Sequence, residues 1–77
     1  MNLNQARELR SKGLVSSAEI LPTPSKSGGW LLTILDTSGK TYLIVDSQDG
    51  VITATTLDEM IEVVRAIGLR AVSVRLG

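Results

Sequence analysis

Two stretches in the middle of the chain are apolar at nearly every position. They are WLLTIL (residues 30–35) and TYLIV (residues 41–45), joined by the polar run DTSGK. Such runs predict two strands, and Gly39 suits a turn residue with positive φ. A strand with one face in water alternates apolar and polar residues, so we expect both strands to be central and covered on both faces. The cover is either the predicted helices or a second copy of the protein.

A helical spacing follows further along the chain. Apolar residues recur through 57–67 in one stripe, and TLDE places Thr56 and Glu59 as a capping box. Gly68 ends this helix. A shorter helix is predicted over residues 2–12, where Asn2 caps the first turn together with Gln5 and Gly13 marks the stop.

Three further strands complete the pattern, over residues 14–21, residues 51–55 and the closing RAVSVRL. In the last of these, Val72, Val74 and Leu76 are expected to point inward. Residues 22–29 (PTPSKSGG) have the composition of a loop. The helix over 57–67 allows the last strand to cross back and pair in parallel with an earlier one.

The sequence therefore predicts one α+β domain spanning residues 1–77, with the order α-β-β-β-β-α-β. Two helices accompany a mainly antiparallel sheet of four to five strands. If both helices cover one face, period-two alternation leaves the other face partly apolar. One set of side chains then contains Leu31, Leu35, Leu43 and Val45, and the opposite set contains Trp30 and Tyr42.

The composition argues against catalysis. The 77 residues include no histidine and no cysteine, which removes the commonest general base and the commonest metal ligands. Asp36, Asp46 and Asp49 lie at turns, where aspartate bonds nearby backbone amides. We expect no enzymatic activity, no metal site and no cofactor. No apolar run has the roughly 20 residues of a membrane span, so a cytoplasmic protein without membrane contact is expected.

Charge is unevenly distributed, although eight basic and eight acidic residues cancel. Acidic residues dominate positions 36–62, and basic residues dominate both ends of the chain. If the first helix and the last strand are neighbours, five side chains make one basic face that contacts nucleic-acid phosphates: Arg7, Arg10, Lys12, Arg70 and Arg75. An ordinary solvated surface is the competing interpretation of these charges.

The apolar sheet favours a different function, a protein-interaction module. Tryptophan is enriched at interface hot spots, and Trp30 begins an apolar strand beside two glycines. Core packing is the competing role for this side chain, because the chain has no phenylalanine. We expect contacts with a second copy, or with another protein, through Trp30, Leu31, Tyr42 and Leu43. A homodimer is the simplest way to cover a two-sided apolar sheet.

The region from SGGW to the end of the chain resembles small accessory proteins carried on bacterial plasmids and integrative elements. The aromatic hairpin, TLDEMIEVVRAIGL and the terminal alternating strand carry this resemblance. These proteins are associated with plasmid partition or replication. The resemblance implies a non-enzymatic maintenance or regulatory role and transfers no catalytic residue.

Overall fold

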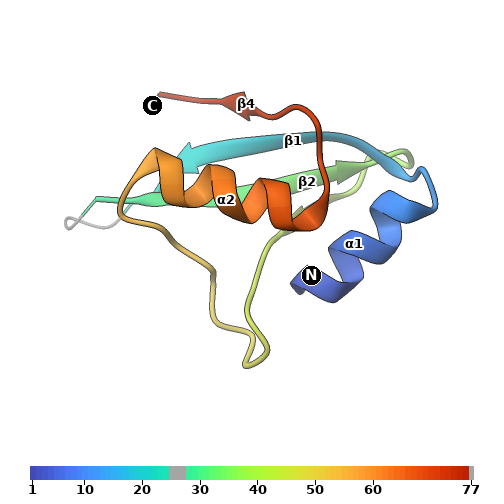
Figure 1. Ribbon diagram of the computed structural model, residues 1–77, viewed down its shortest axis with the longest axis horizontal. Coiled ribbons are helices and arrows are strands. Elements are labelled where there is room, and N and C mark those ends of the chain that lie inside the picture. Colours follow the sequence, from blue (N-terminus) through green and yellow to red (C-terminus); the bar gives the residue numbers. More distant parts are fainter. Residues whose placement is uncertain (25–27, 77) are drawn as a thin grey trace.

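The computed structural model describes residues 1–24 and 28–76, in which two helices lie against a four-stranded sheet (Figure 1). The α+β class is thus confirmed. The elements follow one another as α1 (Leu3–Ser11), β1 (Val15–Pro22), β2 (Trp30–Asp36), β3 (Thr41–Leu43), α2 (Leu57–Ile67) and β4 (Ser73–Val74). This order has one strand fewer than predicted.

Both helices begin at the predicted caps. The Asn2 side chain accepts a hydrogen bond from the backbone N–H of Gln5 at 2.8 Å, and the Gln5 side chain accepts one from Asn2 at 2.9 Å. At α2, the Thr56 hydroxyl accepts from the N–H of Glu59 at 3.2 Å. The Glu59 carboxylate instead accepts from the Thr55 hydroxyl at 3.3 Å, so only half of the second capping box forms.

The strands lie in the order β3-β2-β1-β4, and the sheet is mixed. The β1–β2 and β2–β3 pairs are antiparallel, whereas β4 runs parallel to β1, as its crossover through α2 predicted. Two expectations are wrong. The strand beginning at Thr41 lies at the sheet edge rather than the centre, and the last strand has two residues only. Leu76 lies beyond this last strand and is 85% exposed.

The predicted strand over residues 51–55 is also wrong, because this segment forms only isolated bridges. Asp46 accepts hydrogen bonds from the N–H groups of Gln48 and Gly50, and this turn leads the chain away from the sheet. The chain returns at Ala54, which exchanges two backbone hydrogen bonds with Trp30 at 2.8 and 3.0 Å. The hydrogen bonds of the Asp46 turn therefore take the place of the continuous strand pairing that was predicted for residues 51–55.

The predicted loop over residues 22–29 connects β1 to β2. Thr23 closes its described ends, since its N–H donates to the Gly29 carbonyl and its hydroxyl to the Gly28 carbonyl, both at 3.0 Å. Residues 25–27 lie outside the described residues.

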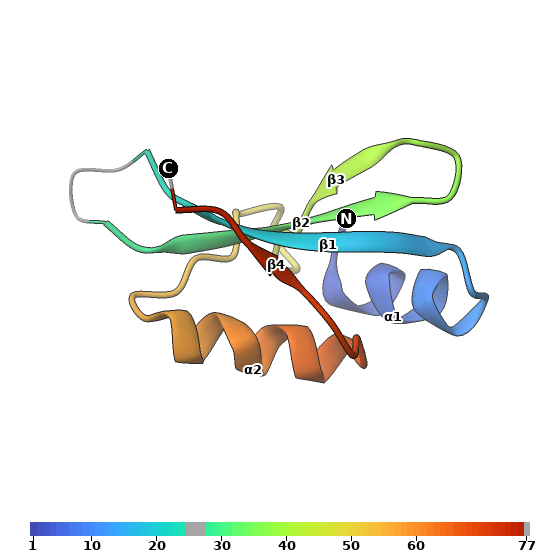
Figure 2. The ribbon, with the colours of Figure 1, turned by 90° about the horizontal axis from the view of Figure 1, so that it is seen from above.

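Both helices cover the same face of the sheet, as Figure 2 shows with the strands seen from above. The buried core lies between these layers. It consists of apolar side chains from α1, α2, the helix-facing side of β1 and β2, and the segments after β3: Ala6, Ala18, Ile20, Leu32, Ile34, Ile44, Ala54, Met60, Val64 and Ile67. Within the described residues, no helix covers the opposite face, which is therefore available for contact.

Candidate interaction surface

The sheet face opposite the helices is the largest candidate surface, and we call it the open face. Cross-strand partners point to the same side of a sheet, and successive residues point to opposite sides. Because Ile20 and Ile34 are buried against the helices, their neighbours in each strand must point the other way. Ser73 of β4, the partner of Glu19, faces the same side. On β1, β2 and β3 the open face consists of Ser17, Glu19, Leu21, Leu31, Thr33, Leu35, Thr41 and Leu43.

Leucine occupies half of these positions. Leu21 and Leu31 are direct cross-strand partners. Leu35 and Leu43 are diagonal neighbours on β2 and β3, because Leu35 is opposite Thr41 and Leu43 is opposite Thr33. Among the described residues, these four side chains belong neither to the buried core nor to the apolar residues packed around it. They lie outside the intramolecular core: Leu21, Leu31 and Leu35 are half-buried within the chain and Leu43 is exposed, so another surface would be needed to bury them fully.

Polar side chains occupy the remaining positions of the open face. Glu19 forms an ion pair with Arg75 at 3.2 Å, which ties β1 to the residue after β4. A shallow hollow of about 230 Å³ lies beside this pair, and hydroxyl groups of Ser17, Thr33 and Thr41 contribute to its walls. The centre of the face can therefore take hydrogen bonds, while the leucines supply apolar area around it.

The structure separates the four residues predicted for protein contacts. Leu31 and Leu43 lie on the open face, and Leu43 is 37% exposed. Trp30 lies on the other side and packs against the buried core. Tyr42 also faces that side, since it is the cross-strand partner of the buried Ile34. The tryptophan thus has the core-packing role that the sequence left as its alternative.

Leu21 and Glu19 are two members of the open face that the sequence did not single out. Their place follows from the β1–β2 register, which sets Leu21 against Leu31 and Glu19 against Thr33. The alternation of Ile20 and Leu21 within a strand was the available signal. Val45, which the sequence grouped with the open-face leucines, follows β3 and donates its N–H to the carbonyl of Met1 at 2.8 Å.

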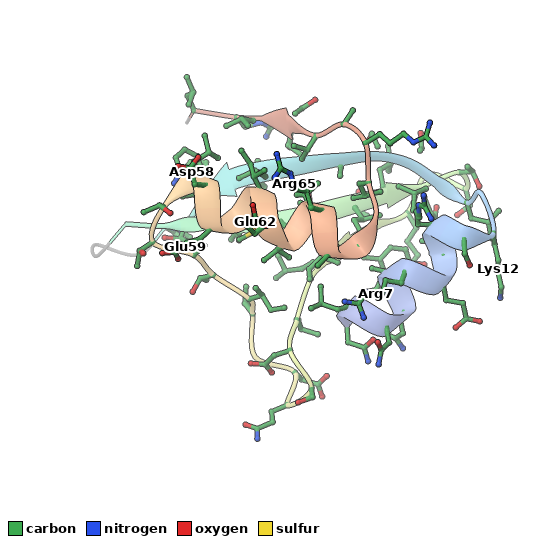
Figure 3. All side chains as sticks on the ribbon, in the orientation of Figure 1. Arg7, Lys12, Asp58, Glu59, Glu62 and Arg65 are labelled. Carbon is green, nitrogen blue, oxygen red and sulfur yellow. The ribbon has the colours of Figure 1, made fainter. Side chains whose placement is uncertain are left out.

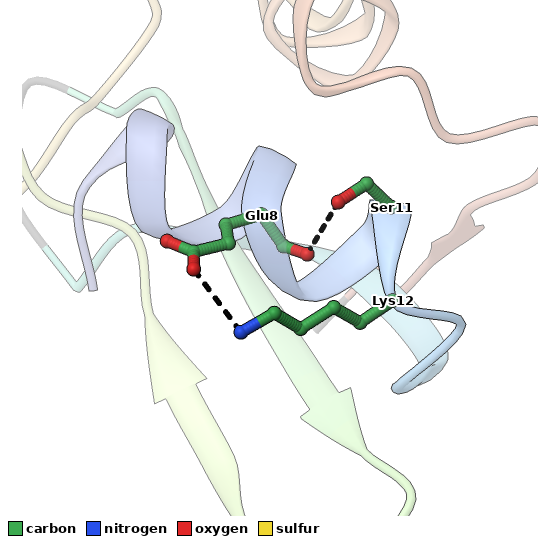
Figure 4. Close-up of polar contacts among 3 residues, drawn as sticks. All are labelled: Glu8, Ser11 and Lys12. Carbon is green, nitrogen blue, oxygen red and sulfur yellow. Dashed lines mark hydrogen bonds and ion pairs between the residues drawn. The ribbon is translucent and has the colours of Figure 1, made fainter.

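The five predicted phosphate contacts do not share one face. Arg7 donates to the carbonyl of Ala66 at 2.9 Å, at the end of α2. Lys12 pairs with Glu8 at 3.1 Å along α1, as Figure 4 shows. Arg75 is bound to Glu19 on the open face. Arg10 and Arg70 alone line a common cleft.

Two of the acidic residues lie at the opposite end of the molecule from Lys12. Figure 3 places Asp58 and Glu59 at the start of α2, at the opposite end of the structure from Lys12 on α1. Negative charge at this helix start complements the helix dipole. In the middle of α2, Glu62 pairs with Arg65 at 3.3 Å. These contacts account for the three acidic residues of α2.

Asp36 organises the β2–β3 turn. Its Oδ1 accepts hydrogen bonds from the Ser38 hydroxyl at 2.6 Å and from the N–H groups of Ser38 and Lys40, each at 2.9 Å. The Ser38 hydroxyl, followed by the Lys40 amide, lowers the pKa of the Asp36 carboxyl below its ordinary value, because these bonds favour the charged form. The predicted turn role of this aspartate is confirmed.

Asp46 repeats this arrangement in the next turn, with Gln48 and Gly50 as donors, and Asp49 adopts a positive φ of 62° there. Asp46 therefore has the turn role that was predicted, and Asp49 lies in the same turn. Across residues 1–24 and 28–76, no three potential ligands are close enough to hold a metal ion. None of the helices formed by these residues has the length and apolar content needed to cross a membrane.

Comparisons with protein-family models, curated proteins and solved structures found no significant match.

Proposed function

We propose that the protein is a non-enzymatic interaction module that forms a homodimer by pairing the open faces of two copies. The observation that carries this proposal is the position of Leu21, Leu31, Leu35 and Leu43 on a sheet face that lies outside the intramolecular core. A sheet face intended for water carries polar side chains instead. In a twofold arrangement the same patch meets itself, so the leucines of each copy cover those of the other.

The dimensions of the molecule support this arrangement. The open face follows the eight residues of β1 and the seven of β2, a length of roughly 25 Å at about 3.3 Å per residue. The isolated chain also exposes 4985 Å². That is more than the roughly 4,500 Å² expected for a folded monomer of this mass.

Electrostatics also permit self-association. The formal net charge is zero, so two copies experience no overall repulsion. On the open face, Glu19 and Arg75 neutralise each other. An approaching copy therefore meets a paired charge instead of an isolated carboxylate, which would be costly to bury.

A charge placed on the open face tests the proposal. Leu43→Glu puts a carboxylate from each copy into the interface, and we expect the dimer to weaken at least tenfold, about 1.4 kcal/mol or more. Leu14→Glu is the matched control, because Leu14 is 40% exposed, close to the 37% of Leu43, and precedes β1 instead of facing this surface. Sedimentation velocity measures both dimers. Equal effects of the two substitutions, with circular dichroism showing both variants folded, would refute the open face as the contact.

For its biological setting, we propose an accessory role on a bacterial mobile element. The support is the sequence resemblance, carried by the aromatic hairpin and TLDEMIEVVRAIGL. The genes around the coding sequence test this role: partition or replication genes beside it agree with the proposal, and a conserved metabolic operon contradicts it.

A further inference from the structure

A second hollow, which we call the arginine cleft, runs between the start of β1 and the connection from α2 to β4. Its volume is about 300 Å³. Arg10 of α1 and Arg70 of the connection line it, together with the hydroxyl-bearing Ser16 and Ser17, and its lining includes no carboxylate. Two positive charges beside one hollow repel each other unless an anion lies between them.

The side chain of Arg10 packs over Gly68, which has no side chain of its own. A Cβ atom built on Gly68 would lie 3.2 Å from Nε and 3.3 Å from Cζ of Arg10, so the guanidinium lies directly over this glycine. Gly68 has a φ of 93° as the C-cap of α2. The C-cap of α2 therefore leaves room for a charged side chain that belongs to α1.

Capping of the C-terminal end of α2 does not account for the presence of both Arg10 and Arg70. The nearby Arg7 already donates to the Ala66 carbonyl at the end of α2. The ion pairs formed within residues 1–24 and 28–76 use Lys12, Arg65 and Arg75. In that same part of the chain, Arg10 and Arg70 have neither an ion pair nor a side-chain hydrogen bond. Their N–H donors are consequently available to a ligand.

A backbone donor adds to the cleft. The N–H and C=O of Trp30 both bond to Ala54, away from β1, and the ladder repeats every second residue. Ile34 therefore directs its polar groups the same way, and its partner Ala18 directs its N–H away from β2. Ala18 lines the arginine cleft, and its N–H is directed toward the side of β1 on which the connection to β4 lies.

We propose that the arginine cleft binds a phosphate monoester group. A doubly charged phosphate matches two guanidinium groups, and its oxygens accept the N–H and O–H donors of arginine, serine and the backbone. Ser17 belongs to both the arginine cleft and the open face, but none of the four leucines lines the cleft, and the proposal does not depend on dimer formation.

The test is an NMR titration of the full chain with inorganic phosphate at constant ionic strength and pH above 7. We expect the amide signals of Ser17, Gly68 and Arg70 to move together. Arg70→Gln should weaken binding about tenfold. Lys12→Gln is the matched control, because it removes the same charge from the end of α1 outside the cleft lining, and it should change binding less than about twofold, since Glu8 already pairs with this ammonium group.

The proposal is overturned if Lys12→Gln weakens binding as much as Arg70→Gln, or if the moving amides spread along the exposed side of α1. Arg10→Gln is measured as well. Because Arg10 packs over Gly68, that variant counts only if it folds, and Arg70→Gln decides the test otherwise. A second titration uses a short DNA duplex without terminal phosphates. If the same amide signals move at a lower concentration of DNA phosphate groups than of inorganic phosphate, the assignment to a monoester is overturned.

Discussion

At Gly29, the backbone of the β1–β2 connection comes closer to another segment than any side chain permits. An added Cβ would lie 2.9 Å from the carbonyl oxygen of Ala54, and φ is 112°. This approach allows Ala54 to pair with Trp30 after the long excursion of the chain beyond β3. One glycine thus fixes where that excursion returns to the sheet.

We predict that Gly29→Ala destabilises the fold more than Gly39→Ala. Both glycines have positive φ, but nothing lies within 4 Å of a Cβ atom at Gly39. The Gly39 variant should therefore lose only about 1–2 kcal/mol from backbone strain. The Gly29 variant should lose about 1–3 kcal/mol more, because its methyl group meets a backbone atom. Urea unfolding measures both free energies, and equal losses would contradict the close contact.

The lowered pKa of Asp36 predicts how the free energy of unfolding depends on pH. Its pKa is lowered in the folded protein, so the unfolded chain binds the proton more tightly. The stability that this carboxylate contributes is complete above the ordinary aspartate pKa of about 4 and is lost as the pH falls through the lower folded value. Asp36→Asn removes this titration. Melting curves between neutral pH and the acid range should therefore show the stability difference between wild type and variant narrowing with acid; a constant difference would refute the assignment.

At the scale of elements, the caps of both helices could be predicted because they depend on residues three apart. The Asn2–Gln5 and Thr56–Glu59 spacings need no distant partner, and both hydrogen bonds are present. Strand boundaries were harder to predict from the sequence. Residues 51–55 have strand-forming composition, but the turn at Asp46 and the contact of Ala54 with Trp30 determine their path. Such competition between a turn and a distant bridge cannot be read from local pattern.

We predict a clear difference between two adjacent threonines. Thr56→Ala removes the hydroxyl that caps α2 and should cost about 1 kcal/mol of unfolding free energy. Thr55→Ala removes only exposed bonds of 3.3 and 3.4 Å to Glu59 and should cost less than about 0.5 kcal/mol. Thermal unfolding of both variants measures this difference. A larger loss for Thr55→Ala would place the start of α2 one residue earlier.

At the scale of the whole molecule, the alternation of side chains predicted which residues share a face of the sheet, but not which face the helices cover. Leu31, Leu35 and Leu43 were assigned to one set, and the structure places that set opposite the helices. The two helices leave one face open, and only the arrangement in space could identify which one. Likewise, the basic residues were expected to share one surface, whereas Arg7, Lys12 and Arg75 bind three different partners.

The proposed homodimer would cover the leucines that lie outside the intramolecular core. Sedimentation equilibrium of the unmodified protein, up to about 100 µM, measures it most directly, since that exceeds the micromolar Kd of a weak interface of this size. The account predicts a mass of twice 8.2 kDa that falls on dilution. A mass of 8.2 kDa throughout the concentration range would contradict it.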